Sequence, residues 1–117
     1  MSVKSNLGKF GEKIAVQYLE RRNYEIIGRN YRCRAGEIDI IAKKDYFLVF
    51  IEVKTRSNVI FGEPVESINN EKAEKIRKIA DYYIAINGVE NAEVRFDIIT
   101  VQKFYKKIVI SHFKNAF

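Results

Sequence analysis

Hydrophobic positions in the first part of the chain recur at helical spacing. Between residues 6 and 22 they follow one another at steps of three and four, along one side of a helix: Leu7, Phe10, Ile14, Ala15, Tyr18 and Leu19. Ser5 or Asn6 is placed to cap this segment, and Asn23 is placed to end it. The pattern predicts an amphipathic helix over residues 6–22.

Residues 24–53 change to a pattern typical of strands. We predict an irregular strand over 24–34 with a bend at Gly28, and a second strand over 37–42. A third strand is predicted over 46–53, apolar nearly throughout, as expected in the middle of a sheet where both faces are buried. The polar turn Lys43–Asp45 has hairpin length and is expected to pair the second strand with the third.

The remainder of the chain adds a helix and two strands. A loop over 55–69 contains Gly62 and Pro64, and Asn69 or Asn70 then caps a helix that stops at Asn87–Gly88. Strands follow over 93–101 and 106–113, separated by a turn at 102–105. The order helix, three strands, helix, two strands predicts one α/β domain over residues 1–117, a mixed five-stranded sheet flanked by helices.

Composition is that of a soluble globular protein. The 117 residues are 47% hydrophobic and 31% charged, enough for one domain with a core of its own. The single cysteine, Cys33, excludes an intramolecular disulfide and favours a reducing compartment. The amino-terminal residues lack the apolar segment of a signal peptide, and the longest apolar run is too short to cross a bilayer. We therefore expect a cytoplasmic protein with no membrane association.

Positive charge is concentrated near the amino terminus. The net charge is +6, and residues 1–34 hold eight basic side chains against three acidic ones. Such a surface favours a polyanion partner through counterion release, although a merely basic soluble domain has the same composition. The phosphate-binding candidates are Arg34, Arg56 and Lys72. Arg56 suits bidentate phosphate binding or a loop surface, and Lys72 suits a site or a solvated helix face.

Acidic side chains occupy positions of the predicted strands where they meet an apolar interior. The two-residue period puts Glu37 and Asp39 on one face of their strand, with Ile38 and Ile40 on the other. Glu37 is expected to be a supporting or exposed acid. Asp39 is the acid that the hairpin carries toward the end of the next strand.

Glu52 and Lys54 share a face at that end of the third strand. If the hairpin forms, Asp39 lies near both, and two carboxylates there repel each other unless a cation or a proton lies between them. Oxygen ligands without His or Cys suit Mg²⁺ or Mn²⁺, and a lysine beside them suits orienting water or offsetting charge on a phosphodiester. The simpler alternative is an ion pair of Lys54 with Glu52 or Asp39.

These segments carry a resemblance to a known family. The chain resembles the YraN-type family of bacterial proteins within the restriction-endonuclease-like superfamily, and is similar to the archaeal Holliday-junction resolvases of that superfamily. The matching segments are Gly8–Glu12, Arg29–Tyr31, Gly36–Ala42, Val49–Arg56, Phe61–Gly62, Lys72 and Arg95–Asp97. They run from about residue 8 to residue 101 in the expected order, and the Glu-Val-Lys-Thr-Arg block after Gly-Glu-Ile-Asp is the most specific.

The resemblance implies a restriction-endonuclease-like fold and assigns roles to the acidic residues. It implies Asp39 and Glu52 as ligands of Mg²⁺ or Mn²⁺, Lys54 as catalytic lysine, and the Val53 carbonyl as a further ligand. Glu12, matching the first-helix glutamate of the resolvases, is a fourth candidate ligand, or else a solvated first-turn acid. The chain departs from the superfamily pattern in having Ile38, not proline, before Asp39.

The function expected on these grounds is metal-dependent cleavage of DNA, with branched, junction-like DNA as preferred substrate and a homodimer as the assembly. Two alternatives stay open. One is a nucleic-acid-binding module that keeps the fold without turnover, and the other is an interaction protein in DNA repair or recombination.

Overall fold

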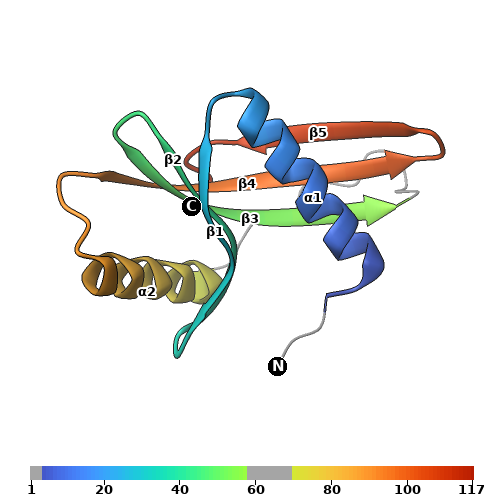
Figure 1. Ribbon diagram of the computed structural model, residues 1–117. Coiled ribbons are helices and arrows are strands. Elements are labelled where there is room, and N and C mark those ends of the chain that lie inside the picture. The colour runs from blue at the N-terminus through green and yellow to red at the C-terminus, as the bar shows by residue number, and fades with distance from the viewer. Residues whose placement is uncertain (1–3, 58–69) are drawn as a thin grey trace.

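The elements of the chain follow the predicted order (Figure 1). The computed structural model describes residues 4–57 and 70–117. Its helices and strands are α1 (Asn6–Arg21), β1 (Glu25–Cys33), β2 (Gly36–Lys44), β3 (Phe47–Ser57), α2 (Asn70–Asn87), β4 (Glu93–Phe104) and β5 (Lys107–Phe113). The predicted α/β architecture is therefore confirmed. The predictions for Phe61, Gly62, Pro64 and Asn69 lie outside the described residues.

The five strands form one mixed sheet in the order β1-β2-β3-β4-β5. Neighbouring strands are antiparallel except β3 and β4, which run parallel and are the two strands on either side of α2 in the sequence. The apolar β3 lies in the middle, as its sequence predicts. The predicted bend at Gly28 is confirmed as a register shift between Ile26 and Gly28.

Two strands run further than predicted. Thr55–Ser57, expected to begin a loop, continue β3, and β4 continues to Phe104 through the expected turn. The reason is non-local pairing, because the β3–β4 ladder extends to the pair Ser57 and Lys103. Polar residues such as Thr55 and Arg56 therefore belong to the sheet when a neighbouring strand satisfies their backbone groups.

Helix α1 begins at the predicted cap and lies close against the end of β3. The Ser5 hydroxyl accepts a hydrogen bond from the Gly8 amide at 3.0 Å. A Cβ atom on Gly11 would overlap the Thr55 side chain, so glycine allows the helix backbone to approach the strand closely. This close approach sets the first turns of α1, including Glu12, against the far end of β3.

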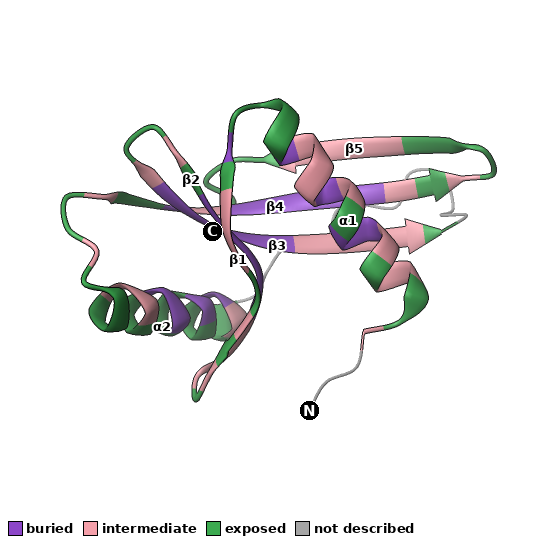
Figure 2. Cartoon of the chain, in the orientation of Figure 1, coloured by how far each residue is buried: buried purple, intermediate pink, exposed green. Residues whose placement is uncertain are grey.

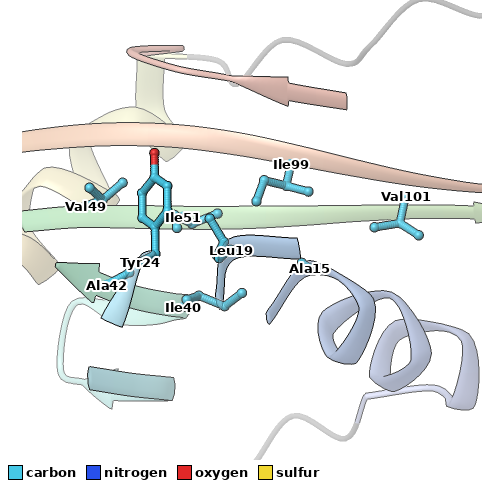
Figure 3. Packing of buried hydrophobic residues seen from close by; sticks show 9 residues of the cluster. All are labelled: Ala15, Leu19, Tyr24, Ile40, Ala42, Val49, Ile51, Ile99 and Val101. Carbon is cyan, nitrogen blue, oxygen red and sulfur yellow. The ribbon is translucent and has the colours of Figure 1, made fainter. Parts of the chain in front are cut away.

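Two hydrophobic clusters bury both faces of the sheet. The cluster under α1 contains Ala15, Leu19, Tyr24, Ile40, Ala42, Val49, Ile51, Ile99 and Val101 (Figure 3). The cluster under α2 contains Ile38, Ile41, Leu48, Phe50, Ile76, Ile79 and Ala80. Buried residues consequently line the first half of β3, the middle of β4 and one side of α2 (Figure 2). No helix in residues 4–57 and 70–117 is long and apolar enough to span a membrane.

Strand β2 changes face at Asp39. The prediction that Ile38 and Ile40 share a face is wrong: Ile38 packs in the cluster under α2, and Ile40 packs in the cluster under α1. The ladder between β2 and β3 runs only from Lys44 to Ile40, so β2 separates from β3 at Asp39. Opposite this point, Asn30 of β1 has a positive φ of 52°, which interrupts the regular alternation of that strand.

Candidate functional site

A cavity of about 370 Å³ lies where β2 separates from β3. Six charged side chains from four elements and the residues before α1 line it: Lys4, Glu12, Asp39, Glu52, Lys54 and Lys72. The three residues predicted to be catalytic thus lie around one cavity, together with the glutamate of α1. Val53 lines it as well. The separation of the strands opens this space, since an unbroken β2–β3 ladder would fill it with paired backbone.

The Asp39 side chain binds the backbone of β3 at the point where the β2–β3 ladder ends. One carboxylate oxygen, Oδ2, accepts a hydrogen bond from the Val53 amide at 2.8 Å, and Oδ1 binds the Lys4 ammonium group. Asp39 is only 7% exposed. The backbone of β3 therefore fixes the orientation of this carboxylate. The contact shown by Val53 is made by its amide, whereas the resemblance implies its carbonyl as a ligand.

Glu52 meets Asp39 inside the cavity. Burial, followed by the hydrogen bond and the negative charge of Asp39, raises the pKa of Glu52 to about 7, and Lys72 at 3.1 Å only partly offsets this rise. Burial also acts to raise the pKa of Asp39, but hydrogen bonds from Glu52, Lys4 and the Val53 amide outweigh it and lower that pKa. As the pH falls toward neutral, Glu52 therefore takes up a proton before Asp39 does.

Lys4 lies between Asp39 and Glu12. Its ammonium group binds Asp39 Oδ1 and lies 2.8 Å from Glu12 Oε2. Burial acts to lower the pKa of Lys4, and hydrogen bonds to Asp39 and Glu12 outweigh it, raising the pKa to about 12. The lysine is therefore charged, and it places a positive charge between two buried carboxylates.

Glu12 is a buried acid, and the alternative of a solvated first-turn acid is wrong. Its side chain is 3% exposed. Oε1 accepts a hydrogen bond from the Asn30 amide group at 2.7 Å and lies 3.8 Å from the Arg29 guanidinium. Oε2 is buried, and its contact in the described part of the chain is with the Lys4 ammonium group at 2.8 Å. This oxygen retains capacity to bind a cation.

The donor set suits a hard divalent cation. Asp39, Glu52 and Glu12 offer carboxylate oxygens, the ligands that Mg²⁺ and Mn²⁺ prefer, and Lys4 shows that a cation is stabilised between two of them. Among residues 4–57 and 70–117, no three acidic, His or Cys side chains converge closely enough to form a complete ligand set. Lys4 lies between Glu12 and Asp39, so it would have to withdraw before these two acids could share one ion.

The other predicted residues divide between the cavity and its surroundings. Lys72 reaches the cavity from α2 and binds Glu52. Arg56 lies half-buried in β3 and not in a loop, and Arg34 is exposed in the turn before β2. Neither arginine lines this cavity. Glu37 forms an ion pair with Arg32 at 2.9 Å, as expected of a supporting acid.

A second buried acid is Asp97 of β4, which lies in the segment Arg95–Asp97 that matches the family but had no predicted role. It is fully buried and accepts hydrogen bonds from Arg95 at 2.9 Å, His112 at 2.7 Å and the Asn115 amide at 3.1 Å. Arg95 also donates to the Tyr24 hydroxyl at 2.6 Å. Burial acts to raise the pKa of Asp97, but the His112 and Arg95 hydrogen bonds outweigh it and lower that pKa.

Sequence reasoning missed Lys4, which precedes the helix and belongs to no motif. It also missed the Asp97 network, although two charged residues at alternate positions of an apolar strand were a signal. His112 has no partner nearby in sequence, but it binds Asp97 fifteen residues earlier.

Fold and site together define a class: an α/β protein whose central strand contributes to a cavity lined by three acids and three lysines. Comparison with known proteins identifies the family. The profile of "Uncharacterised protein family UPF0102" matches residues 11–101, and the chain belongs to this YraN-type family.

Relatives match over almost their whole length. A UPF0102 protein of Clostridioides difficile is 48% identical over 110 residues, covering 94% of this chain and 95% of the relative. A UPF0102 protein of Caldanaerobacter subterraneus is 44% identical, and the match covers 97% of this chain and 96% of the relative. A UPF0102 protein of Flavobacterium psychrophilum is 41% identical, and the match covers 100% of this chain and 98% of the relative.

Proposed function

We propose that this protein is a metal-dependent nuclease that hydrolyses phosphodiester bonds in DNA. The observation that carries the proposal is the meeting of Asp39, Glu52 and Glu12 around one cavity that also contains Lys54. Buried acids facing one another are costly unless a cation joins them. The resemblance to archaeal junction resolvases supports branched DNA as substrate, and a homodimer would supply one site for each strand of a duplex.

In this proposal Asp39 and Glu52 hold Mg²⁺ or Mn²⁺, with Glu12 and the Val53 carbonyl as further ligands. When bound, the metal supplies positive charge that stabilises the phosphodiester as negative charge develops on it. Lys54 orients the attacking water or stabilises the same charge, because its position on β3 aims it into the cavity beside Glu52. Lys72 holds Glu52, and Asn30 holds Glu12.

The test is cleavage of labelled single-stranded, duplex, flap and four-way-junction DNA, and of RNA, with Mg²⁺ or Mn²⁺. Asp39→Asn and Lys54→Met should each reduce the rate by at least about a hundredfold, as expected for groups that act on the transition state. Matched controls are Asp45→Asn and Lys43→Met, which alter exposed residues at the other end of the β2–β3 hairpin. Absence of cleavage by the wild type, or full activity of both site variants, would overturn the proposal.

One observation favours a second candidate, a nucleic-acid-binding module without turnover. Lys4 and Lys72 already neutralise part of the acidic charge, as they would in a site that uses no metal. Such a module would bind DNA with a steep salt dependence that survives Lys54→Met, and it would cut no substrate with either metal.

A further inference from the structure

A second cavity adjoins the candidate metal site on the side of β1. It has a volume of about 330 Å³ and shares Lys4 and Glu12 with the first cavity. The rest of its described lining is polar and charged: Lys9, Arg29, Asn30, Arg32 and Glu37. The two cavities therefore meet at Lys4 and Glu12, and a bound chain could pass from one to the other.

The local backbone of β1 brings two arginines into this cavity. Arg29 and Arg32 are three residues apart, so a regular strand would direct them to opposite faces of the sheet. Asn30 lies between them with φ at 52°, a left-handed conformation that breaks the alternation. Both arginines consequently line one cavity, and Asn30 turns its amide group toward Glu12.

The balance of charge in the second cavity is positive. Four basic side chains face two acids, and each acid already has a basic partner. Glu12 binds Lys4, and Glu37 binds Arg32 at 2.9 Å. Arg29 and Arg32 remain 49% and 42% exposed, so their guanidinium groups reach the solvent. Arginine at such a position suits an anion with several oxygens, since its planar group binds phosphate through paired hydrogen bonds.

We propose that this second cavity binds the phosphodiester backbone of a DNA strand next to the bond that the metal site would cut. The assignment rests on the proposed function for the identity of its ligand. Its described lining contains no aromatic side chain on which a base could stack, and its basic groups suit contacts to phosphate. Binding through this cavity is therefore independent of sequence and sensitive to salt.

The experiment measures binding of fluorescein-labelled DNA by anisotropy in EDTA, where no metal-dependent cleavage occurs. The double variant R29M/R32M should weaken binding about tenfold at 0.15 M salt and lower the slope of log affinity against log salt by about two, one per lost phosphate contact. The charge-matched control is R21M/R77M, which removes two exposed arginines that line neither cavity. It should change affinity less than threefold. R29K/R32K should recover most of the salt slope but only part of the affinity.

The proposal is overturned if R29M/R32M binds DNA like the wild type. It is also overturned if R29M/R32M and R21M/R77M weaken binding equally, because the net positive charge of the protein would then explain both losses. A thermal unfolding midpoint within a few degrees of wild type verifies that R29M/R32M is folded, and the single variants replace it if the midpoint is lower. Failure of the nuclease proposal is distinguishable. If the protein cuts no DNA but R29M/R32M still loses binding selectively, the result supports the phosphate-binding proposal and overturns the nuclease proposal. If R29M/R32M cuts DNA with an unchanged KM, the result overturns the phosphate-binding proposal and leaves the nuclease proposal intact.

Discussion

Two groups of buried acids lie along α1, and they differ in what faces each carboxylate. Asp97 lies near the end of the helix, where Tyr18 contacts His112, and it has donors for both oxygens and the counter-charge of Arg95. Asp39 and Glu52, near the start of the helix, face each other, and each is paired with a lysine, Lys4 and Lys72 respectively. Burial is similar, since the exposed fractions are 0%, 7% and 9%.

The difference matches a structural role for Asp97 and the metal-binding role proposed for Asp39 and Glu52. A buried carboxylate with all of its partners in place holds strands together, and its charge costs little once paired. Carboxylates that face one another repel and so lower the stability of the metal-free protein. Such arrangements occur where a site needs negative charge. The pKa values follow this division at Glu52: its pKa is raised to about 7, whereas those of Asp97 and Asp39 are lowered.

The largest expected effect is on the Asp97 network. Arg95→Met leaves the Asp97 charge buried without its main counter-charge, which should cost about 3–5 kcal/mol in the free energy of unfolding. Urea denaturation at pH 7 measures the loss. Arg77→Met, on the exposed side of α2, is the control and should change stability by less than about 0.5 kcal/mol. A loss below 1 kcal/mol for Arg95→Met would remove the contrast between the two groups.

The next effect is a pH dependence of stability in EDTA. The pKa of Glu52 is about 7 in the folded protein and 4.5 as a free group, so the folded state holds the extra proton between these values. Stability therefore falls as the pH rises through this window, by about 2 kcal/mol between pH 5 and pH 8. Glu52→Gln cannot titrate and should flatten the curve. Equal slopes for the two proteins would show that Glu52 has an ordinary pKa.

A smaller effect is expected from Lys4, which occupies the space between Asp39 and Glu12. Lys4→Met should raise the affinity for Mn²⁺ about tenfold, equivalent to about 1.4 kcal/mol, because the ion no longer competes with an ammonium group. Lys9→Met removes the same charge from the neighbouring cavity and should raise the affinity less than threefold. Isothermal titration measures both. Identical affinities of Lys4→Met and wild type would mean that Lys4 does not compete with the metal.

The smallest effect is predicted for Asp39→Asn in EDTA. The substitution removes the repulsion from Glu52 and keeps an acceptor for the Val53 amide, so the free energy of unfolding should change by less than about 1 kcal/mol or increase. Urea denaturation of Asp39→Asn and Arg95→Met under the same conditions compares the two losses in the free energy of unfolding directly. A loss as large as that of Arg95→Met would show that Asp39 has a structural role.

The local sequence pattern predicted the elements of the fold and part of the site, but not the contacts between residues far apart in the chain. The apolar run in β3 identified the central strand, and the short turn before it implied the hairpin that carries Asp39 toward Glu52. The extension of β3 to Ser57 depends on β4, because Ser57 pairs with Lys103, which lies 46 residues later in the chain. The contact between Lys4 and Asp39 joins residues 35 apart, and that between Arg95 and Tyr24 joins residues 71 apart. Spacing along one strand or helix contains no information on such pairs.

The central claim is that Asp39 and Glu52 form a divalent-cation site, and calorimetric titration of Mn²⁺ tests it most directly. The wild-type protein and Asp45→Asn should each bind Mn²⁺ saturably, with the release of protons because Glu52 is partly protonated at neutral pH. Asp39→Asn and Glu52→Gln should each lower the affinity at least about tenfold while remaining folded. Absence of saturable binding to the wild type, or undiminished binding to both site variants, would contradict the account.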